Sequence, residues 1–282
     1  GADFVATGHY VRKLGFQDTL RSPSELARSF PRLALPRKLG NHTRSGRSVP
    51  ENEFPHSSLL KAKDGNKDQS YFLWRLGQKQ LSRVIFPLGN YTKPQVREIA
   101  RKAGLPTAAA KESQNLCFVG NDIVGFLKKH LKMKPGLITD KSGKIIGKHL
   151  GLGLYTIGQS QGFGANIFPK EQSKGPYFVL RKEVRKNLLV VTKNKKDLLG
   201  KDCLVKEVNW ISGKMPVLPL RVSVKIRSQQ AEMPAVVSKT KKANQFLIRF
   251  LKPQSAITPG QSAVFYHGEE LVGGGIILTS NF

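Results

Sequence analysis

Apolar and polar positions in the first 125 residues alternate between strand-like and helix-like spacing. Residues 2–6 (Ala-Asp-Phe-Val-Ala) form a short apolar run that predicts a buried strand, and residues 7–9 (Thr-Gly-His) are typical of the turn after it. Apolar residues of the segment 68–76 fall on one helical face. A longer helix is predicted to begin after Thr92 as N-cap and to stop at Gly104. This part of the chain is therefore predicted to be mixed α/β.

The stripe of apolar residues on the longer helix has the spacing of a face that packs on a core rather than of a binding surface. It consists of Val96, Ile99, Ala100 and Ala103. Residues 122–131 predict one further short helix, and beyond it the pattern becomes strand-like. Short apolar runs separated by polar turns predict strands at 177–180, 188–192 and 246–250. Many short strands at close spacing predict a small β domain followed by a β-barrel.

Length and composition indicate how many domains these elements can form. The chain has 282 residues, of which 39% are hydrophobic, enough to bury a core in two or three domains. Residues 16–58 are rich in Pro, Ser and Arg without sustained periodicity, which predicts a partly disordered surface insertion. The charges of this insertion either contact RNA phosphates or are simply solvated. No stretch is long and apolar enough to predict a membrane-spanning helix.

The N-terminus has neither an initiator Met nor the basic and apolar regions of a signal peptide. It has the pattern of the middle of a domain, and we therefore expect further sequence upstream.

The charge balance favours a polyanionic partner. The sequence has 47 Lys and Arg against 19 Asp and Glu, a formal charge of +28, spread over its whole length. A generally basic proteome or organelle is the alternative explanation. Binding to anionic membranes has less support, because no basic amphipathic helix carries Trp and Phe on one face.

Cys117 and Cys203 are the two cysteines of the sequence. They form no CxxC pair, so neither a zinc site nor a disulfide scaffold is predicted, and a reducing compartment is indicated. Cys117 lies between a polar segment and a glycine turn at the start of the 122–131 helix, where backbone N–H groups can favour a reactive thiolate. A buried structural thiol is the alternative. Cys203 lies in an alternating strand, and we interpret it as structural.

Two short segments carry polar groups suited to ligand binding. Gly8 and His9 follow the first predicted strand, at the end of a parallel sheet where α/β folds bind ligands, although a structural His is the alternative. Lys67 is suited to phosphate contact, and Asp68 to simple N-capping. The Gly-rich run at 151–164 lacks the GxxxxGK[ST] pattern of a nucleotide-phosphate loop. The residues alone indicate a basic RNA- or nucleotide-binding protein with one candidate thiol.

Taken together, the segments resemble the tRNA-specific 2-thiouridylase family, which thiolates the wobble uridine of certain tRNAs. The resemblance runs in family order from the first residue to the last, apart from the insertion. The matching segments are 1–10, 66–73, 86–89, 113–120, 155–159, and 258–266 with 273–275.

The resemblance implies an α/β plus β fold in three parts. Residues 1–125 would be the C-terminal remnant of a Rossmann-like adenine-nucleotide α-hydrolase domain of the ATP-pyrophosphatase type, with the basic insertion at about 16–58. Residues 126–198 would form a central, mostly β domain. Residues 199–282 would form a C-terminal β-barrel that binds tRNA.

The resemblance also implies a mechanism and a set of functional residues. In the family, ATP and Mg²⁺ serve to adenylate the C2 oxygen of uridine 34, and a cysteine persulfide, loaded by a sulfur-donor protein, delivers sulfur and displaces AMP. Cys117 corresponds to the persulfide-bearing cysteine, and Gly8 to a position that closes on ATP. The residues that correspond to tRNA contacts are His9, Lys67, Asp68, Gln69, Arg227, Ser228 and Gln261.

The sequence departs from the family in ways that limit these expectations. The Ser-Gly-Gly-x-Asp-Ser phosphate loop and a second catalytic cysteine are absent, so we do not expect this fragment to bind ATP fully or to act alone. Where the family usually has Gly, Arg and an aromatic residue, this sequence has Asn115, Ser160 and Ser228. We expect these differences to affect loop closure and tRNA binding. A non-catalytic tRNA- or RNA-binding protein derived from the family is the alternative function, and an unrelated ribosome-associated basic protein is a third. We expect a cytoplasmic location, with the mitochondrial matrix as the alternative.

Overall fold

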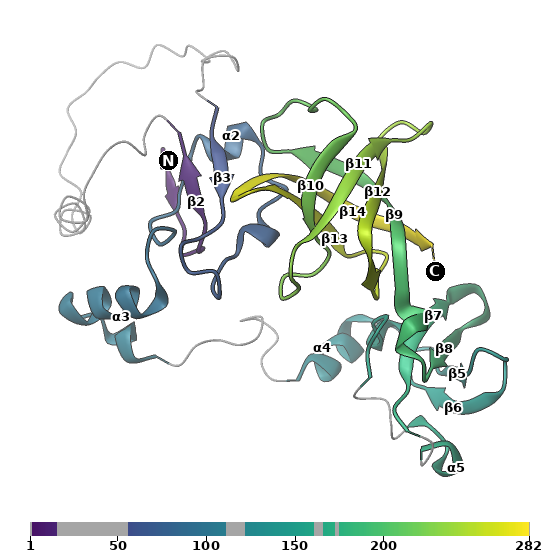
Figure 1. The fold of residues 1–282 in the computed structure, drawn as a ribbon. Coiled ribbons are helices and arrows are strands. Elements are labelled where there is room, and N and C mark those ends of the chain that lie inside the picture. The colour runs from purple at the N-terminus through teal and green to yellow at the C-terminus, as the bar shows by residue number, and fades with distance from the viewer. Residues whose placement is uncertain (1, 16–55, 111–121, 161–165, 173–174, 282) are drawn as a thin grey trace, which may run out of the picture. The chain divides into compact units, whose positions relative to one another are not determined.

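A computed structural model describes residues 2–15, 56–110, 122–160, 166–172 and 175–281 (Figure 1). Most of the predicted insertion and the segment around Cys117 lie outside the described residues. The chain divides into two compact units, each described in turn. The first contains residues 1–99, 209–216 and 264–274, and the second contains residues 100–208, 217–263 and 275–282.

The N-terminal strand of the first unit, β1 (Val5–Ala6), pairs in parallel with β4 (Val84–Ile85). The parallel pairing agrees with the sheet that the sequence predicts, but the prediction of a buried strand is wrong. Phe4 is 43% exposed and Val5 is 59% exposed. The reason is that a strand is buried only by its neighbours, and β4, itself exposed at Ile85, is the one partner of β1 among the described residues.

The helix predicted over residues 68–76 is also wrong. The segment contains a single 3-10 turn, η3 (Ser70–Phe72), before the short helix α2 (Gln78–Leu81). The backbone of this segment makes tertiary hydrogen bonds: the Gln69 N–H donates to the Tyr10 carbonyl at 2.9 Å. Apolar spacing alone does not make a helix when side chains and distant segments compete for the backbone groups.

The longer predicted helix is confirmed within one residue as α3 (Lys93–Lys102), followed by the 3-10 turn η4 (Pro106–Ala109). The Gln95 side chain accepts the Thr92 N–H at 2.8 Å, as in the return half of a capping box. The prediction that its apolar stripe is core is wrong, because no residue of α3 is buried within the described part of the chain and Ile99 is 49% exposed.

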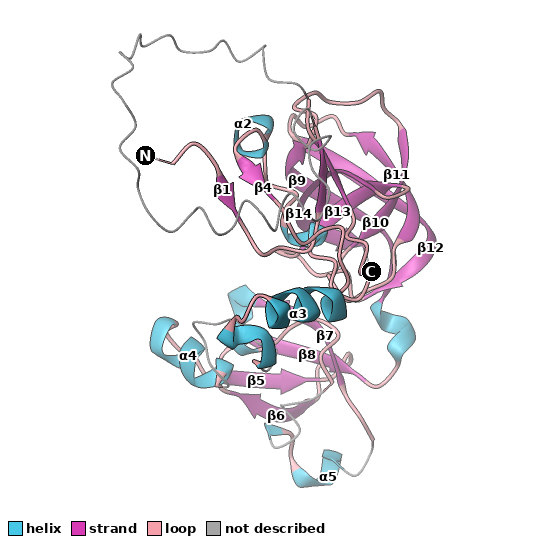
Figure 2. Ribbon diagram, turned by 90° about the vertical axis from the view of Figure 1, so that its left-hand side faces the viewer, coloured by secondary structure: helices cyan, strands magenta, loops and turns pink. Residues whose placement is uncertain are grey.

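The second unit includes the end of α3 and the turn η4, and its next helix is α4 (Ile123–His130), which confirms the helix predicted over 122–131. The Asp122 carboxylate caps it by accepting the Gly125 N–H at 2.8 Å. A four-stranded sheet in the order β6-β5-β8-β7 follows, with β5 and β8 parallel and the other pairs antiparallel (Figure 2). Its strands are β5 (Gly136–Thr139), β6 (Ile145–His149), β7 (Phe178–Glu183) and β8 (Leu188–Thr192). The predicted strands at 177–180 and 188–192 are thereby confirmed.

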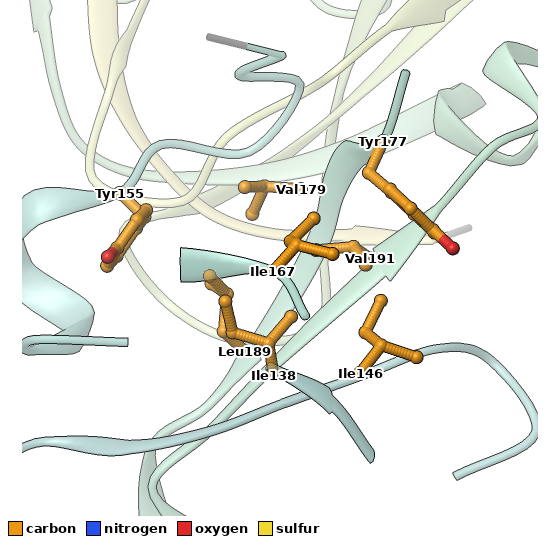
Figure 3. Packing of buried hydrophobic residues seen from close by; sticks show 8 residues of the cluster. All are labelled: Ile138, Ile146, Tyr155, Ile167, Tyr177, Val179, Leu189 and Val191. Carbon is orange, nitrogen blue, oxygen red and sulfur yellow. The ribbon is translucent and has the colours of Figure 1, made fainter. Parts of the chain in front are cut away.

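Both faces of this sheet pack into apolar clusters. Val179, Leu189 and Val191 point into a core shared with Tyr155 and Ile167 (Figure 3). The intervening residues belong to a separate apolar cluster, because successive side chains of a strand point to opposite faces. That second cluster consists of Ile157, Phe178, Leu180, Val190, Leu198 and Ala256.

The remaining strands form an eight-stranded sheet in the order β13-β10-β11-β12-β9-β14-β3-β2, and the additional β13–β14 pairing closes strands β9 to β14 into a six-stranded barrel. The predicted C-terminal barrel is thus confirmed. Its burial alternates along the strands, as in β10 and β11. The strands are β2 (Arg12–Leu14), β3 (Ser58–Leu60), β9 (Leu199–Trp210), β10 (Leu220–Lys225), β11 (Met233–Lys239), β12 (Gln245–Ser255), β13 (Ser262–His267) and β14 (Glu270–Asn281).

Short helical turns lie between β6 and β9 along the chain: η5 (Leu152–Leu154), α5 (Pro169–Gln172), η7 (Val184–Lys186) and η8 (Lys195–Leu198). Within the described residues, every helix is too short or too polar to cross a membrane.

Candidate functional site

In the first unit, a reciprocal pair of hydrogen bonds joins the loop after β1 to the loop that precedes η3. The Tyr10 N–H donates to the Gln69 side-chain oxygen Oε1 at 2.9 Å, and the Gln69 N–H donates to the Tyr10 carbonyl at 2.9 Å. Tyr10 itself is buried. The fold thereby brings together His9 and Lys67–Gln69, two groups of predicted site residues that are far apart in the sequence.

Asp68 directs its carboxylate toward its own loop. One oxygen accepts the N–H groups of Ala62 at 3.0 Å and of Ser70 at 3.3 Å, and the other accepts the Ser70 hydroxyl at 2.7 Å. The Ser70 hydroxyl also lies 3.1 Å from the hydroxyl of Tyr266, in the buried interior of the unit. Asp68 therefore fixes the conformation of the loop that carries Lys67 and Gln69.

His9 and Gly8 form the more open side of this site. The His9 ring bonds through Nδ1 to the Thr7 hydroxyl, which leaves Nε2 as the nitrogen that can meet a ligand. Gly8 is exposed, and a Cβ placed on it would meet only Leu88 Cδ1, at 3.9 Å. Because packing does not require glycine here, the missing side chain leaves the backbone accessible to a ligand.

Two residues that the sequence did not single out complete this group. The Lys93 ammonium lies 5.7 Å from the centroid of the Tyr10 ring, a cation–π distance. The Lys93 N–H donates to the Asp64 carboxylate at 2.9 Å, and the Asp64 carbonyl accepts the Lys67 N–H at 3.0 Å. Lys93 thus adds a second cation to the site beside Lys67. In the sequence it has only the signal of an ordinary first-turn helix residue.

Gly89 packs closely against the backbone of the segment that follows Tyr10 in this site. A Cβ on this buried glycine would lie 2.0 Å from the Val11 carbonyl oxygen and 2.9 Å from the Arg12 nitrogen. Its carbonyl accepts the Lys63 N–H at 2.9 Å. The chain directly after Tyr10 therefore passes in contact with the Gly89 backbone, which only glycine permits.

The second unit holds the other predicted site residues. Arg227, in the connection between β10 and β11, donates through Nη2 to the Ile157 carbonyl at 2.8 Å and contacts the Thr258 hydroxyl at 3.3 Å. The Gln261 N–H donates to the Thr258 carbonyl at 3.2 Å. Thr258 therefore links Arg227 to Gln261. Ser228 follows Arg227 in the same turn and is partly exposed.

The two cysteines differ in what the structure says of them. Cys203 is buried, and burial together with the neighbouring Asp202 charge raises the pKa of its thiol to about 12. A thiol with this pKa stays protonated and is a poor nucleophile, which agrees with the structural role predicted for it. Cys117 lies outside the described residues.

The described residues do not form a metal site on their own. Across this part of the chain, no three His, Cys, Asp or Glu side chains lie together in a group that could hold a metal ion.

Comparison with known proteins identifies the family. Residues 37–121 match the tRNA methyl transferase HUP domain, residues 124–193 the tRNA methyl transferase PRC-barrel domain, and residues 200–277 the aminomethyltransferase beta-barrel domain. The tRNA-specific 2-thiouridylase MnmA of Pseudomonas entomophila is 38% identical over 283 residues, which cover 99% of this chain and 65% of that protein. The proteins of the same name from Alkalilimnicola ehrlichii and Tolumonas auensis are 40% identical over 79% of this chain and 36% identical over 98% of it. The chain belongs to the tRNA-specific 2-thiouridylase family.

The match confirms the predicted fold class, with a HUP domain followed by a PRC-barrel domain and a β-barrel. The chain spans 61 to 65% of the length of these 2-thiouridylases. Within the chain, the residues that the family resemblance singles out form two groups, one in each unit. The first contains Gly8, His9, Lys67, Asp68 and Gln69, and the second contains Arg227, Ser228 and Gln261.

Proposed function

We propose that this chain takes part in the 2-thiolation of wobble uridine 34 in tRNA, as a sulfurtransferase in which Cys117 carries the persulfide. ATP would first adenylate the C2 oxygen of the uridine. The terminal persulfide sulfur then forms a bond to C2 while the C2–O bond breaks and AMP leaves. A second thiol must break the remaining S–S bond, forming a disulfide with Cys117.

Cys203 does not suit the role of that second thiol. It is buried, and its pKa of about 12 keeps it protonated near neutral pH. The proposal therefore assigns the second cysteine, together with most of the contacts to ATP and Mg²⁺, to sequence outside these 282 residues. It keeps the domain limits expected from the sequence, at 1–125, 126–198 and 199–282.

The observation that carries the tRNA-binding part of the proposal is the reciprocal pairing of Tyr10 with Gln69. It joins the loop that carries His9 to the loop that carries Lys67, in a chain with a formal charge of +28. Phosphate neutralisation by Lys and Arg supplies much of the affinity of proteins for nucleic acids. Gly8 would let the ATP-binding part approach the backbone. Arg227, Ser228 and Gln261 would contact the tRNA from the second unit.

The test is tRNA thiolation by the complete protein that contains this chain, with a persulfide donor and ATP. Cys117→Ser should abolish the 2-thiouridine detected by mass spectrometry of digested tRNA. Cys203→Ala, the matched control, should retain it. Unchanged 2-thiouridine in the Cys117→Ser protein would refute the proposed role of Cys117.

A non-catalytic tRNA-binding protein is the other outcome of this test. It would give salt-dependent tRNA binding by the wild-type protein without any 2-thiouridine. For the cellular setting, we propose a cytoplasmic location with a persulfide-donor protein as partner, and fluorescence microscopy of the tagged protein would distinguish the cytoplasm from the mitochondrial matrix.

A further inference from the structure

Arg227 connects two parts of the second unit through a single nitrogen. Its Nη2 lies 2.8 Å from the Ile157 carbonyl oxygen, 3.3 Å from the Ala256 carbonyl oxygen and 3.3 Å from the Thr258 hydroxyl. The Thr258 hydroxyl donates in turn to the Ala256 carbonyl at 2.9 Å. The guanidinium is therefore held by oxygen atoms from two segments that lie far apart in the sequence.

Ile157 lies in a turn that is hydrogen-bonded to β7, a strand of the central four-stranded sheet. The next residue, Gly158, donates its N–H to the Val179 carbonyl of β7 at 2.7 Å, and the Val179 N–H donates to the Gln159 carbonyl at 3.0 Å. Ala256 and Thr258, in contrast, follow β12 of the barrel. The bond from Arg227 to Ile157 therefore ties the central sheet to the barrel.

The two parts are also in close apolar contact at this place. Phe178, Leu180 and Val190 of the central sheet pack in one cluster with Leu198 and Ala256. A Cβ placed on Gly158, which has a φ of +82°, would lie 2.6 Å from Ala256 Cβ. Ala256 itself has a φ of +55°, a conformation that non-glycine residues adopt only when their surroundings impose it. We call the contact region formed by residues 157–158, Arg227 and 256–258 the joint. Its conformation is therefore tightly constrained.

The acceptors of Arg227 are all uncharged. Among the described residues, its side chain forms no ion pair with a carboxylate, so its positive charge is not neutralised by the joint itself. Two explanations for the residue must therefore be separated: a direct contact with an RNA phosphate, and the support of the joint.

We propose that Arg227 is a positioning residue that locks the central domain and the barrel into one RNA-binding body. The lock keeps the turn at 157–159 at a fixed spacing from the turn at 258–261, which contains Gln261. The expected effect of this lock on tRNA affinity rests on the proposed tRNA binding. The lock itself does not rest on that proposal, because it follows from contacts within the chain.

Three variants of this 282-residue chain test the lock by tRNA binding at several salt concentrations. Arg227→Gln removes the charge and the Nη2 donor, Arg227→Lys keeps the charge on a shorter side chain that lacks Nη2, and Gly158→Ala opens the joint without changing any charge. Each should weaken tRNA binding by roughly tenfold, the equivalent of about one lost hydrogen bond in a fixed geometry. Gly158→Ala should leave the slope of log affinity against log salt unchanged.

Gly143→Ala is the matched control, because Gly143 has a similar φ of +89° but a Cβ added to it would have no atom within 4 Å. It should bind tRNA like the wild type. Wild-type affinity in both Arg227→Lys and Gly158→Ala, with a salt slope reduced by about one in Arg227→Gln, would overturn the proposal in favour of a direct phosphate contact.

Calorimetry separates failure of the lock from failure of the proposed function. The central domain and barrel should unfold in one transition in the wild type and in two transitions in Gly158→Ala and Arg227→Gln. Two transitions already present in the wild type would overturn the lock. Absence of tRNA binding by the wild type, with the calorimetric result intact, would instead count against the proposed function alone.

Discussion

Replacing Gly89 by alanine should destabilise the first unit and impair the site together. The added Cβ would lie 2.0 Å from the Val11 carbonyl oxygen, 2.5 Å from its carbon and 2.9 Å from the Arg12 nitrogen. All three atoms are backbone, so no side chain can rotate away to make room. Val11 directly follows Tyr10, and its displacement pulls on the hydrogen bonds between Tyr10 and Gln69.

The magnitude follows from two contributions. Overpacking that forces the backbone to move costs about 1–3 kcal/mol, and a clash with backbone atoms on this scale belongs at the upper end. Movement of Gly89 also weakens the bond that its carbonyl accepts from the Lys63 N–H at 2.9 Å, which is worth about 1 kcal/mol. The free energy of unfolding should therefore fall by about 3–4 kcal/mol, which lowers the melting temperature of this unit by on the order of 10 °C.

Thermal unfolding followed by circular dichroism measures this loss, and tRNA binding at a temperature where the variant is folded measures the effect on the site. Gly65→Ala is the matched control, because a Cβ at Gly65 has no atom within 4 Å. It should change the unfolding free energy by less than about 0.5 kcal/mol. Equal stability of Gly89→Ala and Gly65→Ala would refute the reasoning.

Three further predictions concern the site and the buried thiol. Gln69→Leu leaves the Tyr10 N–H without its acceptor and should cost about 1–3 kcal/mol in urea unfolding, whereas Gln69→Glu, which keeps an oxygen there, should cost less. Gly8→Ala should leave stability unchanged within about 0.5 kcal/mol but reduce thiolation by the complete protein, and unchanged thiolation would contradict the role given to Gly8. Because the folded pKa of Cys203 is raised from 9.0 to about 12, its contribution to stability is complete below pH 9 and is lost as the pH rises to 12, by on the order of 1.4 kcal/mol per pH unit. Cys203→Ala should remove that part of the pH dependence in urea titrations between about pH 8 and 11, and an identical slope in both proteins would contradict it.

Local signals in the sequence predicted the elements that depend on local interactions. The helices α3 and α4 begin beside Thr92 and Asp122. The Gln95 side chain accepts the Thr92 N–H, and the Asp122 carboxylate accepts the Gly125 N–H. The strand β8 was predicted with its observed limits, because an apolar run of five residues between turns leaves few other choices.

Predictions of burial failed where burial depends on a partner outside the segment. The apolar spacing of Phe4 and Val5 is that of a buried strand, yet β1 is exposed, and Ile99 on α3 is exposed for the same reason. A periodic pattern states which face can be buried, and the neighbouring elements decide whether it is.

The site shows the same contrast between features that the local sequence predicts and features that depend on distant segments. Family motifs named Gln69 and Arg227, but no sequence signal placed Gln69 on the backbone of Tyr10 or Arg227 on that of Ile157. These contacts join residues 59 and 70 positions apart. Lys93 was missed because its place over the Tyr10 ring follows from the path of the chain rather than from its own neighbours in the sequence.

The two groups of predicted tRNA-contacting residues share one structural arrangement. In each, a long polar side chain places one end on the backbone of a distant segment: the Gln69 oxygen on the Tyr10 N–H, and the Arg227 Nη2 on the Ile157 carbonyl. Each side chain keeps further donors, Nε2 of Gln69 and Nε and Nη1 of Arg227, for other partners. A loss of affinity on substitution therefore does not by itself distinguish contact from positioning. The salt slope does, because only the loss of a phosphate contact changes the number of counterions released.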